Sequence, residues 1–116
     1  MDTIEPLKDI VIIYHQYCYD GFGAAWAAKK KLRETASCVP SIARDIYPEG
    51  IENKGVYIID FCFTKEIMQE LQKKNKTLVV IDHHISSKEI VESLPGHVFA
   101  LEKSGAKLAW EYFIQM

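Results

Sequence analysis

Short apolar runs alternate with longer helical patterns along most of this chain. The runs DIVIIYH, VYIID and TLVVID are rich in β-branched residues, and runs of this length and composition are typical of strands buried on both faces. The run SCVPSIA is weaker, because Pro40 cannot donate a backbone hydrogen bond and favours an edge strand. The predicted strands cover residues 9–15, 37–43, 56–60, 77–82 and 97–101.

Helical patterns fill the intervals between these runs. An alanine-rich stretch ends in lysines and arginine, which suit the last turns of a helix. Thr64 and Ser104 are candidate N-caps, and Ser86 with Glu89 forms a capping box before a short helix. The predicted helices begin near residues 20, 65, 87 and 105.

Strands joined by helices favour right-handed crossovers and a mostly parallel sheet. We therefore expect an α/β fold, a three-layer Rossmann-like domain with about five strands and helices on both faces. With 116 residues the chain is predicted to form a single domain, residues 1–116.

Composition narrows the class of protein. The formal net charge is −2, so no bulk positive field attracts nucleic acid. Three cysteines without a Cys-x-x-Cys pair argue against a disulfide framework or a thiolate zinc cluster and favour a reducing compartment, here the cytoplasm. The sequence has no signal-peptide pattern and no apolar run of membrane-spanning length.

Polar residues follow three of the predicted strands directly. Parallel sheets bind ligands beyond the carboxyl ends of their strands, so these side chains are expected to meet at one edge of the sheet. They are His15, Cys18 and Asp20 after the first strand, Asp60 after the third, and Asp82, His83 and His84 after the fourth.

Aspartate and histidine that converge without a thiolate cluster suit a metal site with oxygen and nitrogen ligands. Mn²⁺, Fe²⁺, Zn²⁺ and Mg²⁺ are candidates, and imidazole makes a purely Mg²⁺ site less suitable. A single aspartate after a strand is more often the cap of the next helix, and Asp-His-His alone could be a polar loop. Three such clusters at one sheet edge favour a metal site that holds a phosphoryl group and activates water.

Other conspicuous residues have structural interpretations. Trp26 is predicted to pack in the core on the inner side of its helix. Trp110, Tyr112 and Phe113 are predicted to lie in the core or an interface, and His97 to be structural or exposed.

The run VVIDHH resembles the signature of the DHH phosphoesterase family. YHQYCYDGFGAAWAA is similar to the first motif of a variant branch with Cys-x-Asp-Gly, VYIIDFCF to the second motif, and EKSGAKLAWEYF to the Ser-Gly-Ala helix that follows the DHH triplet. The resemblance runs from about Ile10 to Phe113.

This resemblance implies phosphoester or phosphoanhydride hydrolysis assisted by two metal ions, with Mn²⁺ as the expected cofactor and Mg²⁺ or another divalent ion as an alternative. It implies that Asp60 bridges the metals, that His83 is a ligand oriented by Asp82, and that His84 faces the scissile phosphate. His15 and Asp20 would be further metal ligands, from the first motif.

Three further expectations concern one more metal ligand, the substrate-binding residues and the extent of the domain. Cys18 stands where many relatives have an aspartate, and it is a candidate metal ligand. Ser104 and Gly105 are the candidate substrate-binding residues. Relatives usually continue into a second, substrate-gripping domain, so we expect residues 1–116 to form the DHH-like domain alone.

Three functional interpretations remain at this point. The first is a metal-dependent phosphoesterase acting on a nucleotide or short oligonucleotide. The second is a non-catalytic nucleotide- or metal-binding module. The third is a receiver-like protein with coincidental motifs, although receivers lack paired histidines. We expect no membrane association, and an uncovered strand or the last helix could support a homodimer.

Overall fold

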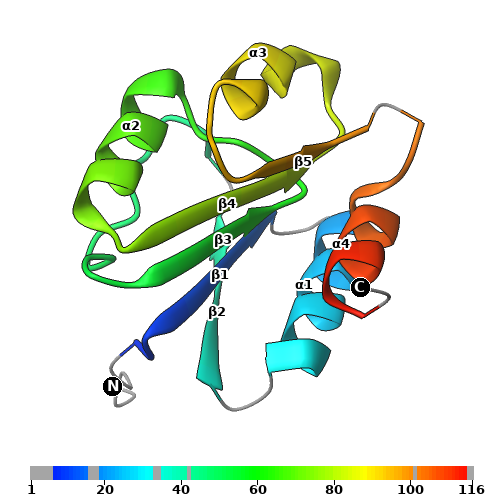
Figure 1. The fold of residues 1–116 in the computed structure, drawn as a ribbon, viewed down its shortest axis with the longest axis horizontal. Coiled ribbons are helices and arrows are strands. Elements are labelled where there is room, and N and C mark those ends of the chain that lie inside the picture. The colour runs from blue at the N-terminus through cyan, green and yellow to red at the C-terminus, as the bar shows by residue number, and fades with distance from the viewer. Residues whose placement is uncertain (1–6, 16–18, 33–34, 42, 101, 115–116) are drawn as a thin grey trace.

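The computed structural model describes residues 7–15, 19–32, 35–41, 43–100 and 102–114 of the chain. Within them, five strands form a single parallel sheet (Figure 1). The strands are β1 (Ile10–His15), β2 (Ala36–Ser41), β3 (Gly55–Ile59), β4 (Thr77–Asp82) and β5 (His97–Phe99). All five lie at predicted positions, and the α/β fold is confirmed.

The strand order β2-β1-β3-β4-β5 contains one change of direction. The connection from β1 leads outward to β2, whereas β3, β4 and β5 follow one another on the other side of β1. In such sheets ligands bind beyond the carboxyl ends of the strands on either side of this switch point. The topology therefore predicts a ligand site beyond the carboxyl ends of β1 and β3.

Helices cover both faces of the sheet, as predicted (Figure 1). Buried residues of α1 and α4 pack with Ile12, Ile59 and Ile81 on one face. Buried residues of α2 and α3 pack with alternate strand residues on the other. The helices are α1 (Tyr19–Leu32), α2 (Lys65–Lys74), α3 (Lys88–Glu92), which follows the 3₁₀ turn η2 (Ile85–Ser87), and α4 (Gly105–Phe113).

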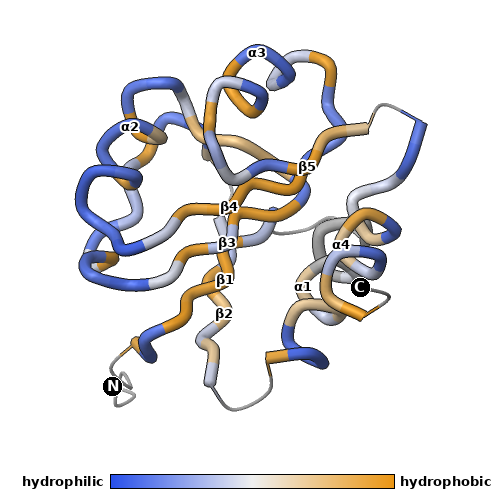
Figure 2. Tube along the Cα trace, viewed as in Figure 1, coloured by the Kyte–Doolittle hydropathy of each residue, from blue (hydrophilic) through white to orange (hydrophobic). Residues whose placement is uncertain are grey.

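Strand alternation divides the core into these two clusters. Val11 and Ile13 face the α2 side while Ile12 faces the α1 side, and all three are fully buried. Figure 2 shows the strands as largely hydrophobic and the outer parts of α2 and α3 as hydrophilic. The central strands are consequently held in register from both faces, which fixes where their carboxyl ends lie.

The prediction that Trp26 lies in the core is wrong. Its side chain is 53% exposed, and its indole stacks on Trp110 of α4 with the ring planes 5° apart. Ala25, Ala27 and Ala28 form the buried side of α1 instead. Their small side chains bring the helix too close to the sheet and α4 to leave room for an indole.

The predicted capping box at Ser86 is also absent. The turn η2 occupies this position, and Ser87 is the N-cap of α3, without a side-chain cap hydrogen bond. Thr64 does stand at the N-cap of α2, again without such a bond. Ser104 is a true cap, because its hydroxyl accepts a hydrogen bond from the Lys107 amide at 3.1 Å.

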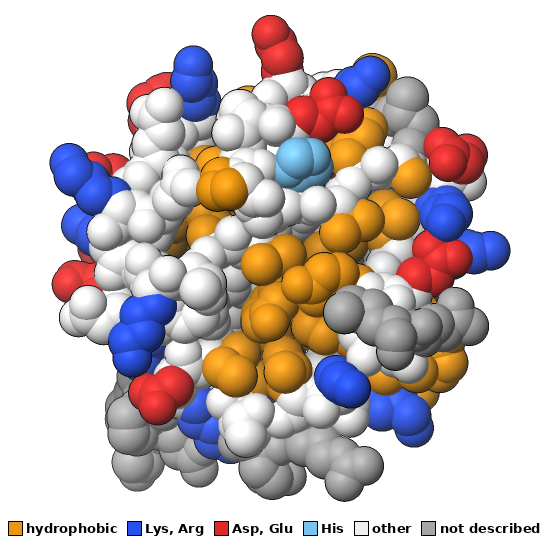
Figure 3. Space-filling view, viewed as in Figure 1, with side chains coloured by type: hydrophobic (Ala, Val, Ile, Leu, Met, Phe, Trp, Pro, Cys, Tyr) orange, Lys and Arg blue, Asp and Glu red, His pale blue; other side chains and the backbone are white. Residues whose placement is uncertain are grey.

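Hydrophobic side chains gather near the centre of one face of the molecule, with charged groups around them (Figure 3). Tyr57, Val79 and Tyr112 are partly buried hydrophobic residues that pack against the core cluster between the sheet and the helices α1 and α4. Among the described residues, no helix combines the length and apolarity needed to cross a membrane.

Candidate metal centre

Two adjacent strands end beside each other at the centre of the sheet. Ile59, the last residue of β3, pairs with Ile81 of β4. Asp60 follows directly and donates its amide hydrogen to the Ile81 carbonyl at 2.8 Å. Asp82 ends β4, and His83 and His84 follow it. The parallel register thus brings residues that are 22 positions or more apart in sequence to one edge.

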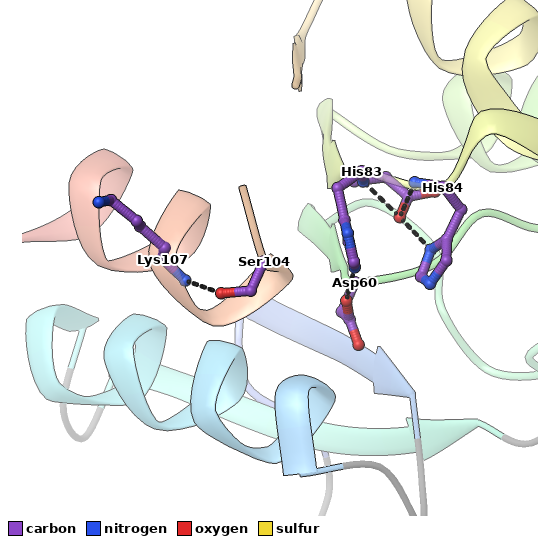
Figure 4. A network of polar contacts seen from close by, with 6 residues as sticks. Asp60, His83, His84, Ser104 and Lys107 are labelled. Carbon is purple, nitrogen blue, oxygen red and sulfur yellow. Dashed lines mark hydrogen bonds and ion pairs between the residues drawn. The ribbon is translucent and has the colours of Figure 1, made fainter. Parts of the chain in front are cut away.

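Four of these side chains form a compact group of potential metal ligands (Figure 4). One ligand atom each from Asp60, Asp82, His83 and His84 lies within 4.8 Å of all the others. The two carboxylates are buried, His83 is half-buried and His84 is exposed. The convergence predicted for the third and fourth strands is therefore present.

Asp60 is held in an unusual position. Its φ of +67° lies in the left-handed region, which aspartate enters more readily than most residues but still at a cost. Its Oδ1 lies 2.9 Å from Nε2 of His83. A Cβ added to Gly105 would lie 2.1 Å from that same oxygen. Only glycine at the start of α4 leaves room for the Asp60 carboxylate.

Asp82 turns its carboxylate toward the backbone that follows it. Oδ1 accepts hydrogen bonds from the amides of His83 at 2.8 Å and His84 at 3.4 Å, and it contacts His84 Nδ1 at 2.6 Å. Oδ2 is buried without a hydrogen-bond partner among the residues that the structure describes. A buried carboxylate oxygen without a donor is costly unless a cation neutralises it.

The expected role of Asp82 as the residue that orients the His83 ring is wrong. Asp82 forms a hydrogen bond with the backbone amide of His83 and not with its ring. Its carboxylate contacts the ring of His84 instead. The reason is local: the aspartate folds back over its own chain, while the His83 ring extends across to Asp60 on the neighbouring strand. The two histidines therefore have different acidic partners.

The donor set fits a divalent cation of the manganese, iron or zinc type. Two buried carboxylates supply anionic oxygens and two imidazoles supply nitrogens of intermediate softness. Oδ2 of Asp82, which has no hydrogen-bond partner among the described residues, adds a buried oxygen that a cation would neutralise. These residues could hold a metal, and the four described donors suffice for one ion.

A cavity of about 170 Å³ borders this cluster. It shares His84 with the metal-ligand group and includes Arg44, whose Nε donates to the Cys62 carbonyl at 2.8 Å. Its lining residues are His15, Ala43, Arg44, Phe61, Cys62, His84, Ser86 and Ser87. Burial raises the pKa of the Cys62 thiol to about 12, with a further increase from Asp82 and an opposing effect of Arg44.

The remaining predicted site residues fall into two groups. His15 lies on the cavity wall with its ring 6.2 Å from that of Phe61, and it is not part of the four-ligand group. Asp20 lies in the first turn of α1, but its side chain is outside the described part of the chain, as is all of Cys18. The metal roles of these three residues stay predictions.

Ser104 and Gly105 lie at the start of α4. The Ser104 hydroxyl caps the helix, and Gly105 lies directly against Asp60. Their substrate-binding role also stays a prediction. In the structure they act on the site by placing α4 against the Asp60 carboxylate.

Arg44 is the cavity residue that sequence reasoning missed. It lies outside every predicted strand and helix, and it is one of two arginines in the chain. Arg44 directly follows the second predicted strand, so it is expected at the same sheet edge as the other polar clusters. This position is the sequence feature that points to the site. No periodicity or known motif marks it.

No family model matches the chain. It is 31% identical over 120 residues to an uncharacterized protein of Acanthamoeba polyphaga mimivirus, and the match covers 89% of this chain and 28% of that relative. It also resembles the crystal structure of an uncharacterized protein from Helicobacter pylori G27, with a TM-score of 0.71 and 17% identity over 93% of this chain and 37% of the other. The chain thus spans less than half the length of both proteins.

Proposed function

We propose that this chain carries the metal centre of a phosphoesterase of the DHH type that its motifs resemble. The substrate is a nucleotide or short oligonucleotide, and the bond hydrolysed is a phosphodiester or phosphoanhydride. The observation that supports this most directly is the convergence of Asp60, Asp82, His83 and His84 beside a cavity that contains an arginine.

A bound Mn²⁺, or a similar divalent ion, would supply Lewis acidity and favour ionisation of water near neutral pH. Asp60 and His83 are the residues best placed to hold it, because their ligand atoms are 2.9 Å apart and the carboxylate is buried. Asp82, with one oxygen unpartnered among the described residues, would supply a further anionic donor.

His84 is the residue that would contact the substrate. When its Nδ1 donates to Asp82, the lone pair stays on Nε2, which makes no hydrogen bond to the described residues. The ring is exposed and lines the cavity. It can accept a hydrogen bond at Nε2 while the Asp82 carboxylate holds the ring in place.

The alternative is a metal- or nucleotide-binding module without catalytic activity. One observation favours it: the described residues provide a single group of four donors, which is enough for one ion. Two-metal hydrolysis uses ions about 3.5–4 Å apart and needs further ligands. His15, Asp20 and Cys18 would have to supply them.

A paired measurement of metal binding and turnover tests the proposal. We expect Mn²⁺ to bind in a calorimetric titration and to support hydrolysis of a dinucleotide or of pyrophosphate. Asp60→Asn keeps the size of the side chain but loses its charge, and it should weaken Mn²⁺ binding by at least about 100-fold. Asp9→Asn, which removes an exposed carboxylate at the opposite end of the sheet, is the control.

The results separate the candidates. Mn²⁺ binding with turnover, both lost in Asp60→Asn, supports the enzyme. Mn²⁺ binding without turnover of any phosphoester supports the binding module. Equal Mn²⁺ affinity in the wild type and in Asp60→Asn would contradict both the enzyme and a metal-binding module that uses this site.

A further inference from the structure

Arg44 is fixed at two points to the segment that follows β3. Its Nε donates to the Cys62 carbonyl at 2.8 Å, and its own carbonyl accepts a hydrogen bond from the Thr64 amide at 3.0 Å. A long, exposed side chain normally samples many rotamers and pays entropy to be ordered. Here the contact with Cys62 already holds the guanidinium beside the cavity.

The guanidinium has donors to spare. An arginine has five N–H donors, and the contact with Cys62 uses only the one on Nε. No carboxylate among the described residues pairs with Arg44. By contrast, Lys74 lies 3.5 Å from Glu70 and Lys103 lies 2.7 Å from Glu111.

The cavity beside Arg44 is suited to an anion. None of its described lining residues is acidic, and Ser86, Ser87 and His15 add groups that can donate hydrogen bonds. Arg44 and His84 line the same cavity, and His84 also belongs to the metal-ligand cluster. The fixed cation and the metal-ligand cluster are therefore close neighbours.

We infer that this cavity is a phosphate subsite and that Arg44 is the residue that holds the phosphoryl oxygens of the substrate. A planar guanidinium presents paired donors that match two phosphate oxygens. His84, which belongs to both the cavity and the cluster, places that phosphate next to the metal ligands. This inference rests on the proposed function, which makes the substrate a phosphoester.

Calorimetric titration with inorganic phosphate tests the subsite, both with saturating Mn²⁺ and in the presence of a chelator. The variants are Arg44→Gln and, as a matched control, Lys76→Gln. Lys76 is exposed and precedes β4 at the opposite edge of the sheet. Each variant loses one positive charge, so a difference between them reports position and not net charge.

We expect Arg44→Gln to bind phosphate at least about tenfold more weakly than the wild type, with Mn²⁺ affinity and thermal midpoint unchanged. Lys76→Gln should match the wild type. Equal phosphate affinity in Arg44→Gln and Lys76→Gln would overturn the inference.

The failure of the inference differs from the failure of the proposed function. If the wild type binds no Mn²⁺ but still binds phosphate through Arg44 in the presence of chelator, the subsite stands and the metal-dependent function falls. If Mn²⁺ binds and supports turnover while Arg44→Gln keeps full phosphate affinity, the function stands and the subsite falls.

Discussion

At the scale of the residue, His83 and His84 show how neighbours in sequence acquire different tasks. Their ring centroids are 4.2 Å apart, yet His83 contacts Asp60, which follows β3, and His84 contacts Asp82 at the end of β4. His83 is half-buried inside the ligand group, whereas His84 opens onto the cavity. The division of labour follows from which carboxylate each ring meets.

This division makes a prediction for two matched variants. His83→Ala should weaken Mn²⁺ binding by at least about tenfold, because it removes a ligand beside Asp60. His84→Ala should retain most of the Mn²⁺ affinity and lose phosphate binding or turnover. Titrations with Mn²⁺ and then with phosphate distinguish the two, and the reverse pattern would show that the roles are exchanged.

A second prediction at this scale concerns Cys62. Burial raises its pKa to about 12, so the thiol stays protonated where an ordinary cysteine, with a pKa of 9.0, begins to ionise. The folded state therefore holds a proton that the unfolded state releases, and this contribution to stability falls as the pH rises from about 9 toward 12.

Alkylation at about pH 8 with peptide mapping checks the state of Cys62. Cys62 should be modified only after unfolding, whereas Cys38, which is exposed, should react in the folded protein, although partial burial raises its thiol pKa and slows the reaction. Between pH 8 and 10 the wild type should also lose stability more steeply than Cys62→Ala. Rapid alkylation of Cys62 in the folded protein would contradict its burial.

At the scale of the element, α4 is positioned by its first turn. Ser104 caps the helix. Gly105 lets the helix lie close to Asp60, because a side chain at position 105 would collide with the Asp60 carboxylate. The resemblance associated these two residues with substrate. In the structure they also lie at the start of α4, which packs against the candidate metal ligand Asp60.

Gly105→Ala should disturb the metal centre without changing any ligand. The new Cβ would lie 2.1 Å from Oδ1 of Asp60, so the carboxylate or the helix must move. We expect a loss of about 1–3 kcal/mol in stability, typical of overpacking, together with weaker Mn²⁺ binding. Thermal unfolding and calorimetry measure the two effects.

Ser104→Ala is the matched control for that variant. It removes the helix cap at a cost of about 1 kcal/mol but adds no atom near Asp60, so its Mn²⁺ affinity should equal that of the wild type. If Gly105→Ala also keeps the affinity of the wild type, the close approach of α4 has no bearing on the centre.

The positions of the strands are easier to predict from the sequence than the buried face of a helix or the form of a turn. The strands were found because parallel, doubly covered strands are continuously apolar, and Asp60 and Asp82 were found because each directly follows such a run. Trp26 was misplaced because an alanine-rich helix has no clear apolar stripe, so its inner face depends on how closely it packs. The turn η2 stands where the capping box was expected, and its N-cap is His84.

At the scale of the whole molecule, the site exists because of the strand order. β1 and β3 lie at the switch point, and β4 lies beside β3, so residues from distant parts of the chain meet at one edge. Sequence could predict this edge from the strand ends alone. It could not predict Arg44 or the pairing of Asp82 with His84, because both depend on loop geometry that no periodic pattern encodes.

The central claim is that the cluster of Asp60, Asp82, His83 and His84 binds a divalent metal ion, with Asp60 and His83 as its principal ligands. Anomalous diffraction at the manganese edge, from crystals of the protein grown with Mn²⁺, tests it most directly. The account predicts a peak within bonding distance of Asp60 and His83, with at least one of the other two residues in contact. A protein that binds Mn²⁺ elsewhere, or crystals with saturating Mn²⁺ and no peak at these four side chains, would contradict it.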